Sequence, residues 1–157
     1  MKRMGIFDKL FKNSEKEGNT EMEQINKDVA QMAEDIVVHM SKILPRELNL
    51  DYSVSSVKLI DALIEKLRSE GSDEKIAENE IMAFGAYVGE VIRKQVGGYW
   101  TKPELAGFPK DGATYSVVLV LPNGGATNPL GRVLKYFRHG SQYSTEIFVE
   151  MNIKQFK

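Results

Sequence analysis

Residues 84–92 read Phe-Gly-Ala-Tyr-Val-Gly-Glu-Val-Ile and place two glycines inside a stretch whose apolar residues otherwise recur with helical spacing. Glycine in a helix interior is about 1 kcal/mol less favourable than alanine, so Gly85 and Gly89 need a compensating contact. They lie one turn apart and form a notch with Ala86 beside them. This spacing predicts tight packing against the first or second helix of the same domain. The alternative is an open cleft that binds a ligand or a partner.

The sequence before this stretch predicts two other helices. The first begins at a capping box, with Thr20 as N-cap and Glu23 three residues later, and ends near Leu44, before a proline. The second is capped at Ser53 and ends before Gly71. The apolar residues that share an inner face are Met22, Ile25, Val29, Met32, Ile36, Met40 and Ile43 in the first helix, and Val57, Ile60, Leu63, Ile64 and Leu67 in the second.

The helix that contains the glycine pair is predicted to start at Ser72 or Asp73 and to end at about Val96. After it the pattern becomes extended. Residues 99–101 and 115–121 are bounded by glycines and prolines, and we expect them to pair as antiparallel strands. The inner residues of the helix are Ile76, Ile81, Phe84, Val88, Val91 and Ile92.

A fourth helix is predicted from its start and stop signals, with Asn128 as N-cap, Pro129 at the first helical position and Gly140 after its end. The tail, residues 144–156, fits a closing helix better than a strand, with Ile147, Phe148, Met151 and Phe156 as its apolar residues. The whole pattern predicts an α+β fold that is mainly helical. It has about four to five helices and a short antiparallel β-hairpin or small sheet near residues 99–121.

The composition of the chain is that of an ordinary globular protein, with 157 residues, 42% hydrophobic and 27% charged. We expect a single globular domain over residues 20–157, preceded by a basic amphipathic arm at 1–12 and a polar linker at 13–19. The absence of cysteine excludes disulfides and thiol chemistry. No segment has the apolar length of a signal peptide or a membrane span, so we expect a cytoplasmic protein.

The arm carries Ile6, Phe7, Leu10 and Phe11 at helical spacing among four basic residues and one acidic residue. Such a segment binds an anionic membrane surface or a groove on a partner, so peripheral membrane contact is one interpretation. The other is that it packs on its own domain or frays. Elsewhere the basic residues are spread thinly through the last third of the chain, so a nucleic-acid partner is not expected.

Glu90 is predicted to lie beside the apolar face of its helix. A carboxylate buried there needs a cation or a hydrogen-bond donor to offset its loss of contact with water. We expect an ion pair with Arg93, Lys94 or Arg132, or a hydrogen bond from a backbone donor near Trp100. A catalytic base would need a second titratable group at a defined distance, and the sequence offers none that stands out, since Asp51 and Asp61 are arbitrary candidates. No catalytic residue is therefore assigned.

Trp100 is expected in the core and Tyr99, its neighbour on the strand, at the surface, because successive strand residues point to opposite faces. His39 and His139 belong to no group with metal-ligand spacing. No metal or cofactor is predicted.

Three motifs of the chain form a recognisable set, namely Leu50-Asp51-Tyr52-Ser53 with Ser56 and Asp61, Phe84 to Val91, and Gly98-Tyr99-Trp100. They resemble those of a set of small uncharacterised bacterial proteins, whose members have a helix ending in Gly-Glu followed by a Gly-x-Trp turn into a strand. The resemblance covers about residues 48–140. It implies no established substrate or cofactor, although some similar small proteins look like immunity partners of bacterial toxins.

Two functions are therefore expected. The first is a non-enzymatic protein-interaction domain, such as an immunity or regulatory factor, that binds a partner through Tyr99, Glu90 and the 102–112 loop. The alternative is a small-molecule or peripheral-membrane binding module that uses the Gly85 and Gly89 groove or the arm. An enzyme ranks third.

Overall fold

A computed structural model describes residues 18–109, 115 and 117–156, so the arm at 1–12 and most of the linker lie outside the described residues. The described part contains five α-helices and a three-stranded antiparallel sheet, as the α+β prediction requires. The elements are α2 (Gly18–Ser41), η2 (Val54–Ser56), α3 (Val57–Ser69), α4 (Glu78–Val96), β1 (Tyr99–Thr101), η3 (Pro103–Ala106), β2 (Val118–Val120), β3 (Ala126–Thr127), α5 (Pro129–His139), η4 (Ser141–Tyr143) and α6 (Thr145–Lys154).

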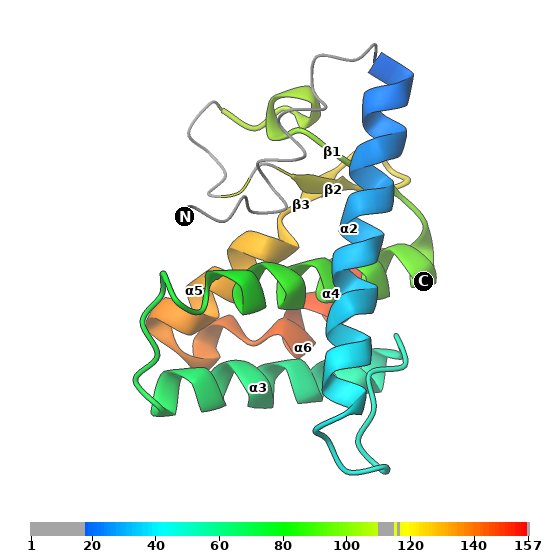
Figure 1. Ribbon diagram of the computed structural model, residues 1–157. Helices are drawn as coiled ribbons and strands as arrows, with labels where there is room; N and C mark the ends of the chain where they lie inside the picture. The colour runs from blue at the N-terminus through cyan, green and yellow to red at the C-terminus, as the bar shows by residue number, and fades with distance from the viewer. Residues whose placement is uncertain (1–17, 110–114, 116, 157) are drawn as a thin grey trace.

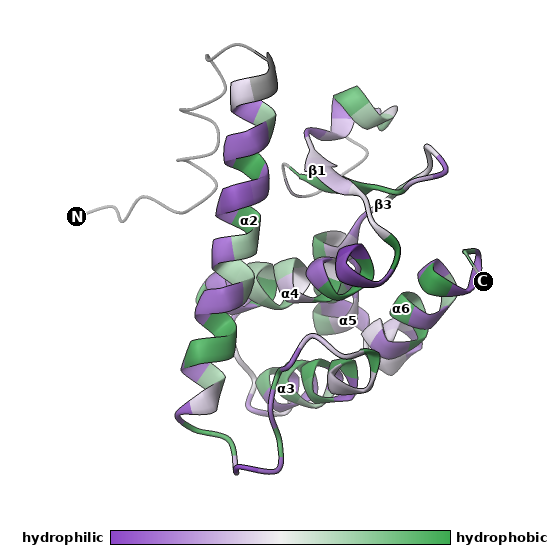
Figure 2. Cartoon of the chain, turned by 90° about the vertical axis from the view of Figure 1, so that its right-hand side faces the viewer, coloured by the Kyte–Doolittle hydropathy of each residue, from purple (hydrophilic) through white to green (hydrophobic). Residues whose placement is uncertain are grey.

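Helices α3, α4, α5 and α6 all pack against one another, and the long helix α2 crosses one side of this group (Figures 1 and 2). The sheet lies beside the N-terminal half of α2, at one end of the molecule. Among the described residues, no helix is both long and apolar enough to cross a bilayer.

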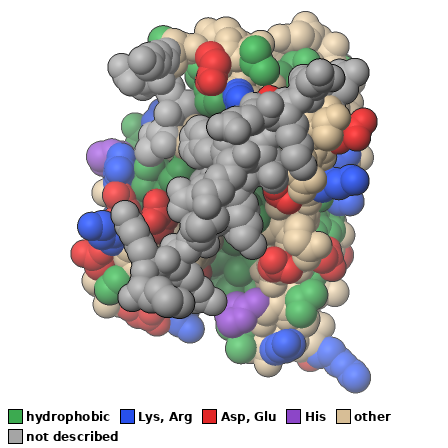
Figure 3. All heavy atoms as spheres, turned by 45° about the horizontal axis from the view of Figure 1, so that its top comes forward, with side chains coloured by type: hydrophobic (Ala, Val, Ile, Leu, Met, Phe, Trp, Pro, Cys, Tyr) green, Lys and Arg blue, Asp and Glu red, His purple; other side chains and the backbone are tan. Residues whose placement is uncertain are grey.

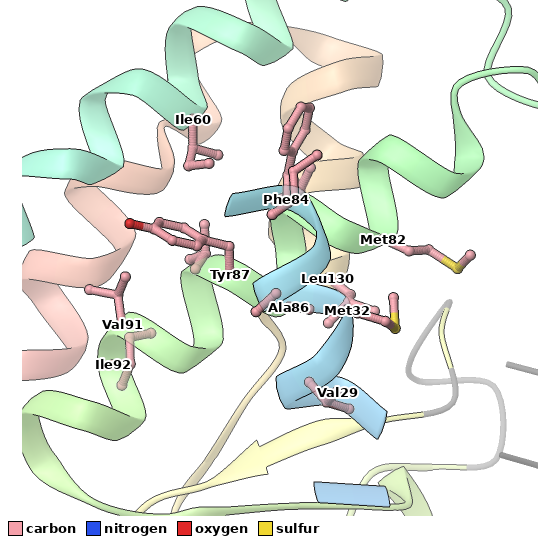
Figure 4. Packing of buried hydrophobic residues seen from close by; sticks show 14 of the residues in the cluster. Val29, Met32, Ile60, Met82, Phe84, Ala86, Tyr87, Val91, Ile92 and Leu130 are labelled. Carbon is pink, nitrogen blue, oxygen red and sulfur yellow. The ribbon is translucent and has the colours of Figure 1, made fainter. Parts of the chain in front are cut away.

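Helix α4 is the centre of the core, because all nine residues from Phe84 to Ile92 are buried. A helix that is buried on every side needs apolar or small residues all round, which explains why polar residues are nearly absent from this stretch. Figure 4 shows α4 side chains packed between α3, α2 and α5, with Ile60, Val29 and Leu130 around them.

The sheet has the strand order β1-β2-β3, with Trp100 opposite Leu119 and Leu119 opposite Thr127. The predicted antiparallel pairing of the first two strands is confirmed. The second strand is shorter than the predicted 115–121, and β3 was not predicted, because a two-residue strand leaves no alternation to detect.

Several predicted helix ends are confirmed by hydrogen bonds. The Asn128 side chain accepts from the Gly131 amide at 3.0 Å, and α5 starts at the next residue. Gly140 follows α5 with a φ of 109°, a conformation that favours glycine. Ser53 accepts from the Ser56 amide at 3.2 Å, but it caps the short turn η2 that leads into α3, and the residue before α3 itself is Ser56.

Two predicted helix starts are wrong. Helix α2 begins at Gly18, so Thr20 lies inside the helix and is not its N-cap. Helix α4 begins at Glu78 instead of residue 72 or 73. The Asp73 side chain accepts from the Lys75 amide at 2.8 Å, and this local turn competes with the helix. Ile76, predicted to be internal, is therefore 80% exposed.

The tail is a helix, as predicted, but its inward face differs from the prediction. Ile147 and Met151 are 51% and 66% exposed, while Val149 and Ile153 are buried. Asp61 of α3 sets this rotation, because its carboxylate holds the first residues of α6. It accepts from the Ser144 hydroxyl at 2.6 Å and from the Thr145 amide and hydroxyl at 2.7 and 2.5 Å.

Replacing Asp61 by alanine is expected to lower the free energy of unfolding by about 2–3 kcal/mol, because a helix cap and several charge-assisted bonds are lost together. Urea unfolding followed by circular dichroism measures this. Asp35→Ala is the control, since Asp35 is exposed and accepts a hydrogen bond from Gln31 on the same helix. Equal losses in the two variants would mean that Asp61 does not hold α6.

Candidate functional site

The space beside each of the two glycines of α4 is filled by another part of the same chain. A Cβ at Gly85 would lie 2.6 Å from the Cα of Leu130, and one at Gly89 would lie 2.1 Å from Cη2 of Trp100. The prediction of close packing holds, but the partners are the start of α5 and Trp100 instead of the first or second helix. The alternative of an open groove at Gly85 and Gly89 is contradicted, because Leu130 and Trp100 occupy that space.

Glu90, one residue after the second glycine, is 2% exposed and has both carboxylate oxygens engaged. Oε2 accepts from Nε1 of Trp100 at 3.0 Å and from Nε of Arg93 at 2.6 Å, and Oε1 accepts from Nη2 of Arg93 at 3.0 Å. This hydrogen-bonded ion pair raises the pKa of the Arg93 guanidinium. Of the three predicted cations, Arg93 is the partner. The donor at Trp100 is the indole and not a backbone amide.

Asn26 of α2 completes this cluster from the other side of β1. Its Oδ1 accepts from the Trp100 amide at 2.8 Å, and its Nδ2 donates to the Trp100 carbonyl at 3.0 Å. One side chain thus satisfies both backbone groups that Trp100 turns away from β2, as a neighbouring strand would. Sequence reasoning missed Asn26. The one signal in the sequence is that Asn26, an amide residue, directly follows Ile25, which belongs to the apolar face of this helix.

We name Asn26, Glu90, Arg93 and Trp100 the clamp. It fixes β1 through one indole and two backbone bonds. Trp100 is completely buried and Tyr99, its neighbour, is 45% exposed, so both burial predictions are confirmed. The clamp therefore holds one aromatic ring inside the core and presents the next one at the surface.

No family model, curated protein or solved structure matches the chain. The resemblance to small bacterial proteins thus stays a prediction.

The two other carboxylates considered as partners for Glu90 are engaged elsewhere. Asp51 accepts from the Ser53 amide at 3.0 Å and from its hydroxyl at 2.5 Å, and these bonds lower the pKa of Asp51. Asp61 caps α6, as described above. Both acids serve local structure, so neither forms an acid–base pair with Glu90.

Within the described ranges, no three His, Asp or Glu side chains are grouped as metal ligands. A shallow cavity of about 400 Å³ is lined by Asp73, Glu74, Lys75, Glu78 and Tyr115, none of which was predicted as a site residue. Glu74 there forms an ion pair with Arg138.

A second polar cluster lies at Tyr52, the one described non-glycine residue with a positive φ, 64°. Its amide donates to the Tyr87 hydroxyl at 2.8 Å, which also shares a 2.6 Å bond with Ser56. The two tyrosine rings stack with centroids 4.9 Å apart. A non-glycine residue in this conformation costs free energy, and these contacts offset the cost.

The Tyr52 ring also ties α2 to α4. Its hydroxyl donates to Glu34 at 2.9 Å, and the Lys94 ammonium lies 4.8 Å above the ring centre. Burial and then the Glu34 hydrogen bond raise the pKa of Tyr52. Sequence reasoning used Tyr52 only as part of a resemblance, because none of its partners is close in sequence.

Alkaline pH is expected to destabilise the fold through its tyrosines. Burial raises the pKa of Tyr52, Tyr87 and Tyr136, and raises the pKa of Tyr115 to about 12. Unfolded tyrosines ionise near pH 10. The folded chain therefore holds more protons above pH 10, and stability is complete below that pH and falls as the pH rises toward about 12.

The measurement is the urea midpoint at pH 9 and at pH 11, with tyrosinate absorbance recorded in parallel. Tyr52→Phe should lower the midpoint at pH 9, because the bond to Glu34 is lost, but should reduce the drop between the two pH values. A midpoint that is the same at both pH values would contradict this account.

Proposed function

We propose that the protein is a non-enzymatic interaction module that binds a protein partner through the surface formed by Tyr99 and η3. The observation that carries the proposal is the contrast on β1, where Tyr99 is 45% exposed and the next residue is completely buried and clamped. A tyrosine on a fixed backbone binds with little loss of conformational freedom, and tyrosine is enriched among the residues that dominate interface energies.

The described part of the 102–112 loop, residues 102–109, extends this surface, and residues 110–112 lie outside the described residues. Leu105 in η3 is 71% exposed. Lys102, the residue directly before η3, forms an ion pair with Glu21 of α2. Figure 3 views the molecule from the end that carries the sheet, and outside the grey atoms charged side chains of both signs lie among isolated hydrophobic ones. This mixture fits a polar interface rim with apolar anchors.

Glu90 does not belong to the contact surface in this proposal. Its carboxylate is buried, and its two oxygens are occupied by Trp100 and Arg93. Its role is to hold β1, so Glu90, Trp100, Gly85 and Gly89 support the surface from below. The resemblance to small bacterial proteins favours an immunity or regulatory partner in the cytoplasm.

The test is recovery of a partner from cells that express the protein naturally, with equal amounts of wild type and Tyr99→Ala. Loss of an anchor tyrosine should weaken the complex about 30-fold, which corresponds to roughly 2 kcal/mol. Met151→Ala is the matched control, because Met151 is 66% exposed on α6. The proposal fails if Tyr99→Ala retains the partner as wild type does, or if both variants lose it equally.

A further inference from the structure

Val38, in the last turn of α2, and two residues of the segment that links α2 to η2 expose aliphatic side chains. Val38, Ile43 and Leu48 are 46%, 61% and 43% exposed. We name residues 38–48 the tip. In Figures 1 and 2 the chain after α2 projects as a loop at the end of the molecule opposite the sheet. Each exposed aliphatic group costs free energy in water, so a projecting group of three calls for an explanation.

Basic side chains accompany these apolar ones. Lys42 and Arg46 are exposed on either side of Ile43, and Glu47 is the single acid of the tip. His39 is also exposed, one residue after Val38. Apolar residues that alternate with cations at a projecting end match the chemistry of an anionic lipid surface, which has negative headgroups outside and hydrocarbon beneath.

We propose that the tip inserts into the interface of an anionic lipid bilayer, with Ile43 and Leu48 entering the headgroup and acyl boundary and Lys42 and Arg46 contacting the headgroups. The aliphatic composition favours lipid over a protein partner, because protein hot spots are rich in Trp, Tyr and Arg and poor in Leu and Val. The convex shape also favours lipid, since a projecting loop enters a fluid surface without needing a complementary groove.

The tip is held in shape before it meets a membrane. The Leu44 amide donates to the Met40 carbonyl at 2.8 Å, and the Leu48 amide donates to the Pro45 carbonyl at 2.9 Å. Leu50, just beyond the tip, is only 4% exposed. The chain is therefore fixed at both ends of the loop, and insertion requires little further ordering.

The position of the tip leaves the Tyr99 surface accessible. Asn26 contacts β1, and Ser41 at the end of α2 lies 15 residues further along the helix, a distance of about 22 Å. Membrane contact at the tip and partner contact at Tyr99 thus involve different ends of α2. The membrane inference does not depend on the protein partner, and either can fail alone.

Vesicle binding tests the proposal, with the full chain and vesicles of phosphatidylcholine, alone or mixed with phosphatidylglycerol. The full chain should sediment with the mixed vesicles. Ile43→Ser with Leu48→Ser should lower the partition coefficient about 10- to 100-fold. Lys42→Gln with Arg46→Gln should lower it roughly 20-fold on mixed vesicles and leave it unchanged on neutral ones. Ile147→Ser with Met151→Ser is the control pair, since both residues are exposed on α6.

Because the chain contains no cysteine, one environment-sensitive fluorophore can be placed at a chosen site. A label at Leu48→Cys should shift to shorter wavelength with mixed vesicles, and a label at Met151→Cys should not. Equal shifts, or no shift at residue 48, would overturn the proposal. Binding that is abolished by Phe7→Ser with Phe11→Ser but unaffected by the tip variants would assign it to the arm and overturn the proposal as well.

Discussion

Gly85→Ala is expected to lower the free energy of unfolding by about 2–3 kcal/mol, even though alanine is the better helix former by about 1 kcal/mol. The added Cβ would lie 2.6 Å from the Cα of Leu130, which is backbone and cannot rotate away. Helix α5 would have to move away from α4 as a whole. Urea unfolding followed by far-ultraviolet circular dichroism measures the loss.

Asn79→Ala provides the matched control in the same helix, because Asn79 is exposed. It should leave stability unchanged or slightly higher. Gly89→Ala should also destabilise the chain, but there the added Cβ meets the Trp100 ring. Trp100→Phe, which loses the indole bond to Glu90, should therefore cost less in Gly89→Ala than in wild type. If Gly85→Ala were as stable as Asn79→Ala, close packing would not be the reason for the glycine.

Glu90→Ala is expected to destabilise the fold by about 2–4 kcal/mol. Removing one partner of a buried ion pair leaves the other uncompensated, and the Trp100 indole would also lose its acceptor. The expected loss is below the largest measured for buried pairs because the Arg93 side chain is 34% exposed and regains water. The same urea experiment applies, with tryptophan fluorescence as a second signal from Trp100.

Glu90→Gln separates charge from hydrogen bonding at the same site. A glutamine carbonyl can still accept from Trp100, so this variant should lose less than half of what Glu90→Ala loses. Arg93→Gln should cost more in wild type than in Glu90→Gln, because the two residues are coupled. Equal costs in both backgrounds would show that the ion pair adds nothing to stability.

The parts of the fold that the sequence predicted are those with local causes. The cap at Asn128 and the glycine after α5 each follow from residues a few positions apart, and β1 and β2 are consecutive strands whose own residues and flanking glycines and prolines mark them. The start of α4 was missed because the Asp73 turn competes with the helix there, and the hydrophobic pattern does not register such a competitor. The outward face of α6 was missed because Asp61, on another helix, sets its rotation.

The sequence predicted only those parts of the clamp that lie close together along the chain. Glu90 and Arg93 are one turn apart on a helix, so their pairing could be predicted from the sequence. Asn26 lies 74 positions from Trp100, and nothing in the sequence around either residue indicates that the two are in contact. The notch at Gly85 was recognised from the cost of glycine in a helix, but its occupant, Leu130, depends on the tertiary fold.

We propose that the clamp presents Tyr99 as the anchor of a protein interface. Site-specific photocrosslinking tests it most directly, with a photoreactive phenylalanine derivative in place of Tyr99 and, separately, in place of Met151, in cells that express the protein naturally. We expect one dominant crosslinked species from position 99 and none from position 151. The same species from both positions, or none from position 99 when it forms at position 151, would contradict the account.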